Sequence, residues 1–374
     1  MPTRRKMEVA PPAEEIFSFI QGSWLNWLLV FIPISISIEM LGLPKIWLFA
    51  TSALAIIPLA GLIGESTEQL AHRVGSGLGG LLNATLGNAP ELIIGLLALR
   101  AGLYEVVKAS ITGSIIGNVL LVLGLSMLVG GWRRGVQRFS RTHAGASASM
   151  LFLAVVALIM PALFDLTVLG SLRRTSPALE ELSLLVAMVL IATYLASLVF
   201  SLRTHRELMT AVPPETAIPR LRFRSSLVLL LAATALTSVE SELLVTAIQE
   251  TTAALGMTEF FVGVVVVALV GNAAEHSTAV LMAKRDKMDL AVTIAVGSST
   301  QIALFVAPLL VFASFLFGRP MPLVFNAFEI VGVGLAVVAT SIVALDGESN
   351  WFEGVQLLAV YTVLAIVFFF VPGS

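Results

Sequence analysis

Long apolar runs separated by short polar stretches dominate the pattern of the chain. Eleven of these runs are long enough for an α-helix to cross the ~30 Å hydrocarbon core of a bilayer, which takes about 18 to 25 residues. They span residues 24–41, 44–64, 76–100, 106–131, 146–164, 180–203, 224–249, 258–284, 289–317, 322–344 and 352–371. The runs lack the ten-residue alternation of a membrane β-barrel. The pattern therefore predicts an all-α membrane protein with 11 transmembrane helices.

The longest polar stretch between two runs divides the chain into halves. It spans 204–223 and contains three prolines, which interrupt helices. We predict a cytosolic N-terminal tail over 1–23, a first transmembrane helix over 24–41, five-helix repeats over 44–203 and 224–371, and a cytosolic connecting loop over 204–223. Because five spans is an odd number, the second repeat enters the membrane from the opposite side, which makes an inverted repeat.

A short motif supports this duplication. The segment GNAPEL at 87–92 returns as GNAAEH at 271–276, an offset of 184 residues. The same offset relates Gly113-Ser114 to Gly297-Ser298. In transporters built from inverted repeats, the substrate site lies near the bilayer midplane between the halves.

Most of the 22 lysine and arginine residues lie in the N-terminal tail and in the loops after the fourth, sixth and eighth runs. Positive residues concentrate on the cytosolic side of membrane proteins. The N-terminus is therefore expected in the cytosol and the C-terminus on the opposite side. Acidic residues follow the basic residues of the tail, and no small-residue cleavage site closes the first run, so we expect a retained helix rather than a cleaved signal peptide.

The amino-acid composition agrees with a protein that is surrounded by lipid rather than by water. The chain is 57% hydrophobic and 12% charged, with a mean hydropathy of +0.95, whereas soluble domains are about 25% charged. The net charge of −2 gives no basic field for nucleic acid. With no cysteine, the chain has no disulfides and no thiolate metal sites. No H-E-x-x-H, G-x-S-x-G or phosphate-loop motif occurs, so we expect no enzyme and no ATP-driven step.

Two acidic residues lie deep within the apolar runs. Glu91 and Glu275 belong to the repeated motif, and a carboxylate at the centre of a membrane helix costs roughly 2.5 to 3.5 kcal/mol on insertion scales. Such a group needs a partner or a wet cavity. On a continuous helix, the asparagine and glycine three and four residues before each glutamate would share its face. Pro90 would disturb the first of these helices and free carbonyl oxygens.

These residues suggest a cage of oxygen ligands. The candidate cation ligands are Glu91, Glu275, Asn88, Asn272, Gly87, Gly271, Ser114, Ser298 and Gln301, with Asn118, Ser299 and Thr300 nearby. Six to eight oxygen ligands suit calcium, and the few histidines argue against a soft metal. The competing interpretations are acidic residues that only hydrogen-bond neighbouring helices, and hydroxyls that only pack in the Gly113–Gly117 GxxxG segment.

Four further residues are candidates for a proton or cation pathway: Glu68, Glu240, Glu242 and His276. A solvated helix end is an equal explanation for Glu68 and for nearby Glu65. A packing role is an equal explanation for His276, which has Leu92 as its counterpart in the first repeat.

Together, GNAPELIIGLLALRAG with SIIGNVLLVLG, and GNAAEHSTAVLMAKRDKMDLAVTIAVGSSTQIALF, resemble the cation/proton exchanger family of the calcium/cation antiporter superfamily. The resemblance implies one helix followed by two inverted five-helix repeats. It also implies that Glu91 and Glu275 are the central acidic residues, and that Glu68 and Glu242 match acidic residues at the cytosolic ends of their helices. The joint between the halves, Leu202 to Arg224, departs from the family, because it has only two acidic residues among five arginines. No long N-terminal regulatory tail is seen either.

We therefore expect a secondary antiporter that exchanges Ca²⁺, or another divalent cation, for H⁺ by alternating access. Two neighbouring carboxylates in a pocket of low dielectric cannot both stay charged when the pocket is empty, so calcium and protons compete for it. The alternatives are a Na⁺/Ca²⁺ exchanger, a passive cation channel and, least favoured, a membrane enzyme. We expect no cofactor, and the partners are expected to be the lipid bilayer and the transported ions. The location is expected to be a prokaryotic plasma membrane or an organelle membrane, and the protein either a monomer or a homo-oligomer.

Overall fold

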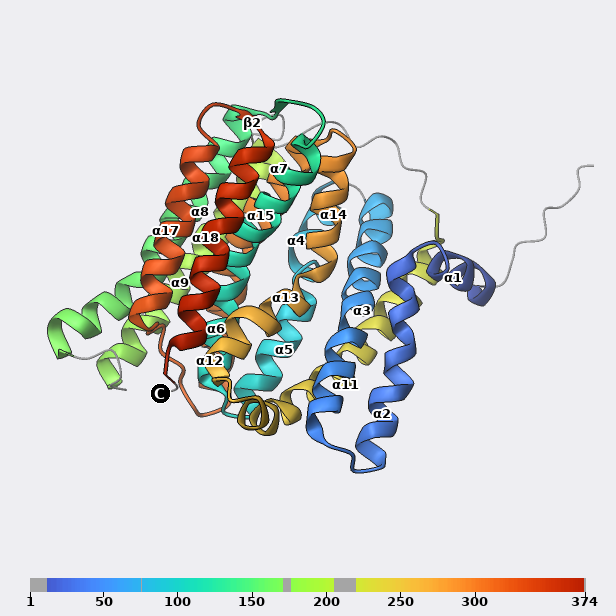
Figure 1. The fold of residues 1–374 in the computed structure, drawn as a ribbon, viewed down its shortest axis with the longest axis horizontal. Coiled ribbons are helices and arrows are strands. Elements are labelled where there is room, and N and C mark those ends of the chain that lie inside the picture. The colour runs from blue at the N-terminus through green and yellow to red at the C-terminus, as the bar shows by residue number, and fades with distance from the viewer. Residues whose placement is uncertain (1–11, 75, 171–175, 205–219, 373–374) are drawn as a thin grey trace, which may run out of the picture.

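The protein is helical almost throughout in a computed structural model, which describes residues 12–74, 76–170, 176–204 and 220–372 (Figure 1). Among these residues, 7 helices are long and apolar enough to cross a membrane. Counting each of three bent helix pairs as one span raises that number to 10, and Ala327–Val343 is a shorter apolar helix. The chain is thus a multi-pass membrane protein. The predicted connecting loop and the start of the predicted tail lie mostly outside the described residues.

The first half of the chain forms the elements α1 (Pro12–Ile20), η1 (Trp24–Val30), α2 (Phe31–Met40), α3 (Lys45–Val74), α4 (Ser76–Leu86), α5 (Ala89–Arg100), α6 (Tyr104–Ile116), η2 (Gly117–Val122), α7 (Leu123–Gly131), α8 (Arg141–Phe164), η3 (Asp165–Leu169), α9 (Pro177–Val199) and η4 (Phe200–Thr204). Here η1 is a 3₁₀ helix and the other η segments are π-helical: η2 joins α6 to α7, whereas η3 and η4 continue the C-terminal ends of α8 and α9.

The second half forms α11 (Phe223–Leu255), α12 (Glu259–Phe261), η5 (Val262–Val267), α13 (Ala268–Gly271), α14 (Ala273–Lys284), α15 (Met288–Gln301), η6 (Ile302–Val306), α16 (Ala307–Leu316), α17 (Ala327–Val343) and α18 (Trp351–Phe370). Two short strands, β1 (Gln137–Arg138) and β2 (Glu348–Ser349), pair antiparallel, with Gln137 opposite Ser349. They join the loop after α7 to the loop before α18 at one end of the bundle (Figure 1).

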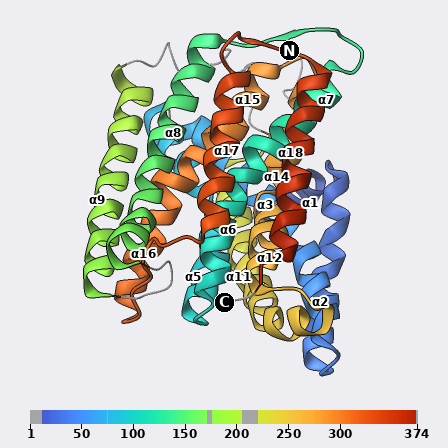
Figure 2. The same cartoon turned by 60° about the vertical axis from the view of Figure 1, so that its left-hand side comes forward.

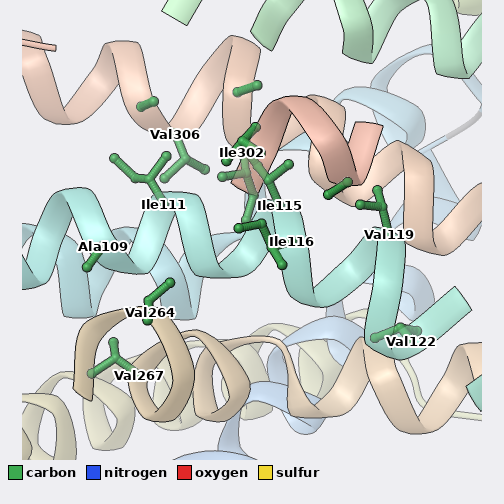
Figure 3. Packing of buried hydrophobic residues seen from close by; sticks show 14 of the residues in the cluster. Ala109, Ile111, Ile115, Ile116, Val119, Val122, Val264, Val267, Ile302 and Val306 are labelled. Carbon is green, nitrogen blue, oxygen red and sulfur yellow. The ribbon is translucent and has the colours of Figure 1, made fainter. Parts of the chain in front are cut away.

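A large apolar core surrounds α6 and its π-turn (Figure 3). Ile111 and Ile115 of α6 face Ile302 and Val306 of η6, while Val264 of η5 lies on the other side. A Cβ atom at Gly113 would lie 2.0 Å from the carbonyl oxygen of Val264. Only glycine therefore allows α6 and η5 to pack this closely.

A second, smaller apolar cluster lies where α3 packs along α11. Leu59 and Ile63 of α3 contact Leu229 and Ala233 of α11, and residues of α1 and η1 pack against them. Figure 1 shows α2, α3 and α11 side by side, next to the main bundle. By contrast, α8, α9, α17 and α18 lie on the outside of the bundle (Figure 2) and expose large apolar side chains such as Leu153, Val189 and Ile342. This is the surface expected for contact with lipid.

The helix boundaries differ from the sequence prediction at several places. The second helix runs ten residues past 64, to Val74, so Glu68 lies within it. The helix α1, within the predicted N-terminal tail, meets the next helical segment at 110°. The tenth helix starts at Ala327 rather than 322. Most importantly, the two runs that carry the repeated motif are broken helices.

Candidate cation-binding site

The first copy of the motif lies at a helix break. α4 ends at Leu86, α5 begins at Ala89, and the two axes differ by 43°. Asn88 has backbone angles of φ −97° and ψ 19°, outside the helical region. Pro90 is in the first turn of α5, where the missing N–H has no helical partner to lose.

The second copy breaks its helix at the same place. α13 ends at Gly271, α14 begins at Ala273, and the bend is 60°. Asn272 repeats the backbone conformation of Asn88, with φ −92° and ψ 5°. Because Ala274 stands where the first copy has Pro90, proline does not cause this break. The expectation that glycine, asparagine and glutamate share one face of a continuous helix was wrong: Gly87, Asn88 and Asn272 lie outside the helices, and Gly271 is the last residue of α13.

The breaks place each glutamate in the first turn of the helix that follows. Glu91 is in the first turn of α5 and Glu275 in the first turn of α14. Carboxylates are favoured there by the helix dipole, and the broken backbone leaves carbonyl groups without helical partners. Discontinuous helices of this kind form the ion sites of many secondary transporters.

Glu91 reaches across to the helix break in the other half of the chain. A Cβ atom at Gly271 would lie 3.4 Å from Glu91 Cγ, so Glu91 packs directly on the break in the other half. Glu91 and Glu275 are close enough to repel each other when both are charged. Glu91 Oε2 is buried and has no hydrogen-bond partner among the described residues. The geometry thus leaves a carboxylate oxygen available to a ligand.

Polar side chains from α6 and α15 complete the cluster. Ser298 of α15 donates a hydrogen bond to Glu275 Oε2. Asn88 Nδ2 donates to Gln301 Oε1 at 2.6 Å. Asn272 Nδ2 donates to Ser114 Oγ at 2.9 Å. Each asparagine at a break therefore bonds a helix of the other half, so the two halves are tied together at the site.

His276 joins this network through Asn118. Its Nε2 lies 3.0 Å from Asn118 Oδ1, and Asn118 Nδ2 lies 3.4 Å from Asn272 Oδ1. Asn118 is on the π-turn η2 and Gln301 immediately precedes the π-turn η6. Such π-turns occur frequently at functional sites.

A small cavity lies next to Glu91. Its walls include Ser110 and Ser114 of α6, Gly271 at the break, and Ile302 of η6. Sequence reasoning missed Ser110, which lies four residues, one helical turn, before Ser114. It also missed Glu329, a buried residue of α17 whose Oε1 accepts a hydrogen bond from Thr112 of α6 at 2.9 Å. An acidic residue inside the apolar run 322–344 was the available signal.

Of the four candidate pathway residues, only His276 joins this network; the three acidic candidates lie elsewhere among the described residues. Glu68 and Glu242 are exposed on α3 and α11, and Glu68 lies 3.8 Å from His72. Glu240 is fully buried and bonded to Ser35 of α2. Within the described part of the chain, no three histidine or acidic side chains form a metal-binding group. A cation at the central cluster would therefore depend on two carboxylates and on neutral amide, hydroxyl and carbonyl oxygens.

Broken helices that carry paired carboxylates between two halves of a membrane bundle define a secondary cation transporter. The chain belongs to the family described as sodium/calcium exchanger protein, whose model matches residues 44–203 and again 225–370. The exchanger family predicted from the two motifs is thereby confirmed.

Individual relatives are similar over nearly the whole chain. It is 46% identical over 360 residues to a Ca(2+)/H(+) antiporter of Aphanothece halophytica, covering 92% of this chain and 96% of that protein. It is 38% identical to a vacuolar calcium ion transporter of Schizosaccharomyces pombe, covering 95% of this chain and 87% of the relative. The solved structure of native YfkE matches with a TM-score of 0.81 at 40% identity, over 93% of this chain and 100% of that one.

Proposed function

We propose that this protein is a secondary antiporter that exchanges Ca²⁺ for H⁺ across a membrane by alternating access. The observation that carries the proposal is the meeting of Glu91 with the helix break before Glu275, each glutamate from one half of the chain. The similarity to a protein named Ca(2+)/H(+) antiporter supports this choice of ions.

In this proposal, calcium binds as substrate between the two helix breaks. Glu91 and Glu275 supply the negative charge. The neutral oxygens come from Asn88, Asn272, Ser114, Ser298 and Gln301, and from backbone carbonyls near Gly87 and Gly271. Calcium takes six to eight oxygen ligands in flexible geometry, which such a mixed set can provide.

Exchange is coupled because the empty, doubly charged site is unfavourable. Two carboxylates at close range repel each other strongly where water is scarce. Either one calcium ion or two protons neutralises them, so both loaded states can pass between the two openings and the empty state cannot. Glu68 and Glu242 would attract cations toward the site, and His276 would tune the network next to Glu275.

We further propose the eleven-helix topology, with α17 as a span and with inverted five-helix repeats over 44–203 and 224–371. The two segments matched by the family model support this division. Loops assigned to the cytosolic side also lie together, since β1 pairs with β2 and Arg134 Nε lies 3.8 Å from Asp286 Oδ1. The N-terminus is then cytosolic, in a prokaryotic plasma membrane or an organelle membrane.

The test is flux in proteoliposomes that contain the purified protein. Glu91→Gln and Glu275→Gln keep the shape of the side chain but remove its charge, so each should abolish calcium-driven proton movement. Glu250→Gln makes the same change at an exposed position of α11 and should transport normally. Near-normal transport by either central variant would overturn the proposal.

A Na⁺/Ca²⁺ exchanger is the second candidate, because the matched family model carries that description. The same vesicles distinguish the two functions. A sodium gradient imposed at equal pH on both sides should drive no calcium uptake if protons are the counter-ion. Uptake driven by sodium alone would favour the second candidate.

A further inference from the structure

A second buried carboxyl group lies where three helices meet, outside the central cluster. Glu240, near the middle of α11, is fully buried. Its Oε1 lies 2.8 Å from Ser35 Oγ on α2, and Ser52 of α3 lies beside the same carboxyl group. Glu240 Oε2 is buried without a hydrogen-bond partner among the described residues. An ionised carboxylate in this position would lose its hydration and would have only serine hydroxyls near it among the described residues.

The hydrogen bonds of Ser35 indicate whether the Glu240 carboxyl group is protonated. Ser35 Oγ lies 2.8 Å from Glu240 Oε1 and also 2.8 Å from the carbonyl oxygen of Ile32. A hydroxyl has one proton, so it can donate to only one of these acceptors. If Glu240 is protonated, it donates to Ser35, and Ser35 donates to Ile32. Both short contacts are then hydrogen bonds.

Among the described residues, the groups that act on the Glu240 carboxyl group are the hydroxyls of Ser35 and Ser52, and no charged side chain is among them. The ionisable groups on the elements that pack against α11 are Glu14 and Glu15 of α1, Glu39 of α2, Lys45, Glu65, Glu68, His72 and Arg73 of α3, Glu91 and Arg100 of α5, and Glu259 of α12. Several of them have other partners: Glu39 pairs with Lys45, Glu15 with Arg222, and Glu259 with Gln249. On α11 itself, Glu242 is exposed.

We propose that Glu240 is a proton-binding site, separate from the Glu91–Glu275 pair, that holds a proton in this conformation. One carboxyl group and two hydroxyls offer too few oxygens for calcium, so the ligand is the proton alone. The proton can leave only when water reaches the contact between α2, α3 and α11. The role of Glu240 in exchange rests on the proposed antiport, whereas its protonation does not.

Infrared difference spectroscopy of the full-length protein tests the proposal. A protonated carboxyl group has its own C=O stretching band, distinct from that of a carboxylate. At neutral pH and saturating calcium, the wild-type spectrum minus that of Glu240→Gln should contain one such band. The control Glu250→Gln, on the exposed side of the same helix, should give no such difference. Ser35→Ala should shift the frequency of the band, because it removes the hydrogen-bond acceptor.

Two results would overturn the proposal. Wild type and Glu240→Gln without any difference in this band across the pH range would show that Glu240 is not protonated. A band that disappears when calcium is added and returns when calcium is removed would place Glu240 in the cation site. If Glu240→Gln does not fold, the frequency shift in Ser35→Ala decides alone. The infrared experiment measures protonation and not transport. A failure of calcium–proton exchange in vesicles would therefore count against the proposed antiport and not against the protonation of Glu240.

Discussion

Single side chains at the helix breaks distinguish the two glutamates of the proposed site. Glu275 accepts a hydrogen bond from Ser298, and Glu91 retains a buried oxygen that has no hydrogen-bond partner among the described residues. The two glutamates are therefore not equivalent, although their motifs repeat. Glu275 is oriented by a neighbour on α15, whereas Glu91 lies against the glycine of the opposite break.

Removing the hydroxyl of Ser298 tests this orientation. A hydrogen bond to a charged group contributes about 1.5 to 3 kcal/mol. Without it, Glu275 is less well oriented, so part of this free energy is lost from calcium binding. We expect Ser298→Ala to raise the calcium concentration for half-maximal uptake by about 5- to 20-fold, or ~1 to 2 kcal/mol. Ser341→Ala removes a hydroxyl that bonds only its own helix and should leave uptake unchanged. Equal uptake curves for the two variants would contradict the assigned role.

At the scale of elements, close packing of α6 holds the site together. α6 supplies Ser114 to the hydrogen-bond network and packs directly on η5, the turn that leads to the second helix break. Gly113 permits this contact. Four residues later, no neighbouring atom of the described part of the chain lies within 4 Å of the place where a Cβ of Gly117 would lie. The two glycines of one GxxxG segment therefore have different roles.

This difference predicts opposite outcomes for two similar substitutions. Gly113→Ala forces α6 away from η5, and overpacking of this kind costs typically 1 to 3 kcal/mol. We expect a clear fall in the melting temperature of the purified protein and a loss of transport. Gly117→Ala meets no neighbour and should be tolerated, since alanine favours helix over glycine by about 1 kcal/mol. Equal melting temperatures for both variants would show that α6 and η5 are not in tight contact.

At the scale of the whole molecule, the two halves interlock. Asn88 bonds Gln301 and Asn272 bonds Ser114, so each half completes the hydrogen bonds of the other half's helix break. The site exists only where the halves meet. A change in their relative position would alter both breaks together, which is what alternating access requires.

The proposed orientation in the membrane can be tested with single cysteines, because the natural chain has none. Arg133 and Arg319 are both exposed, on loops assigned to opposite sides. In intact cells, a membrane-impermeant thiol reagent should label Arg319→Cys at once. It should label Arg133→Cys only after the membrane is permeabilised. The reverse pattern would invert the topology.

The sequence determined the class of this protein and indicated the residues of its proposed site. Long apolar runs predicted a multi-pass helical membrane protein, since lipid requires each spanning helix to be apolar. The repeated GNAPEL and GNAAEH segments pointed to Glu91 and Glu275, because buried charge is costly and its symmetric repetition is not accidental. Both inferences depend on local composition and spacing, which a sequence displays directly.

Only the tertiary structure decided where the helices break and which side chains meet. The bend at Asn272 has no proline to signal it, and the pairing of Asn88 with Gln301 joins residues 213 positions apart. The burial of Glu240 is also a tertiary property. Within the sequence of α11 it is one of several glutamates, and only the contact with α2 and α3 buries it. Such features arise from packing between segments that are distant in the sequence, and the local pattern of residues does not predict that packing.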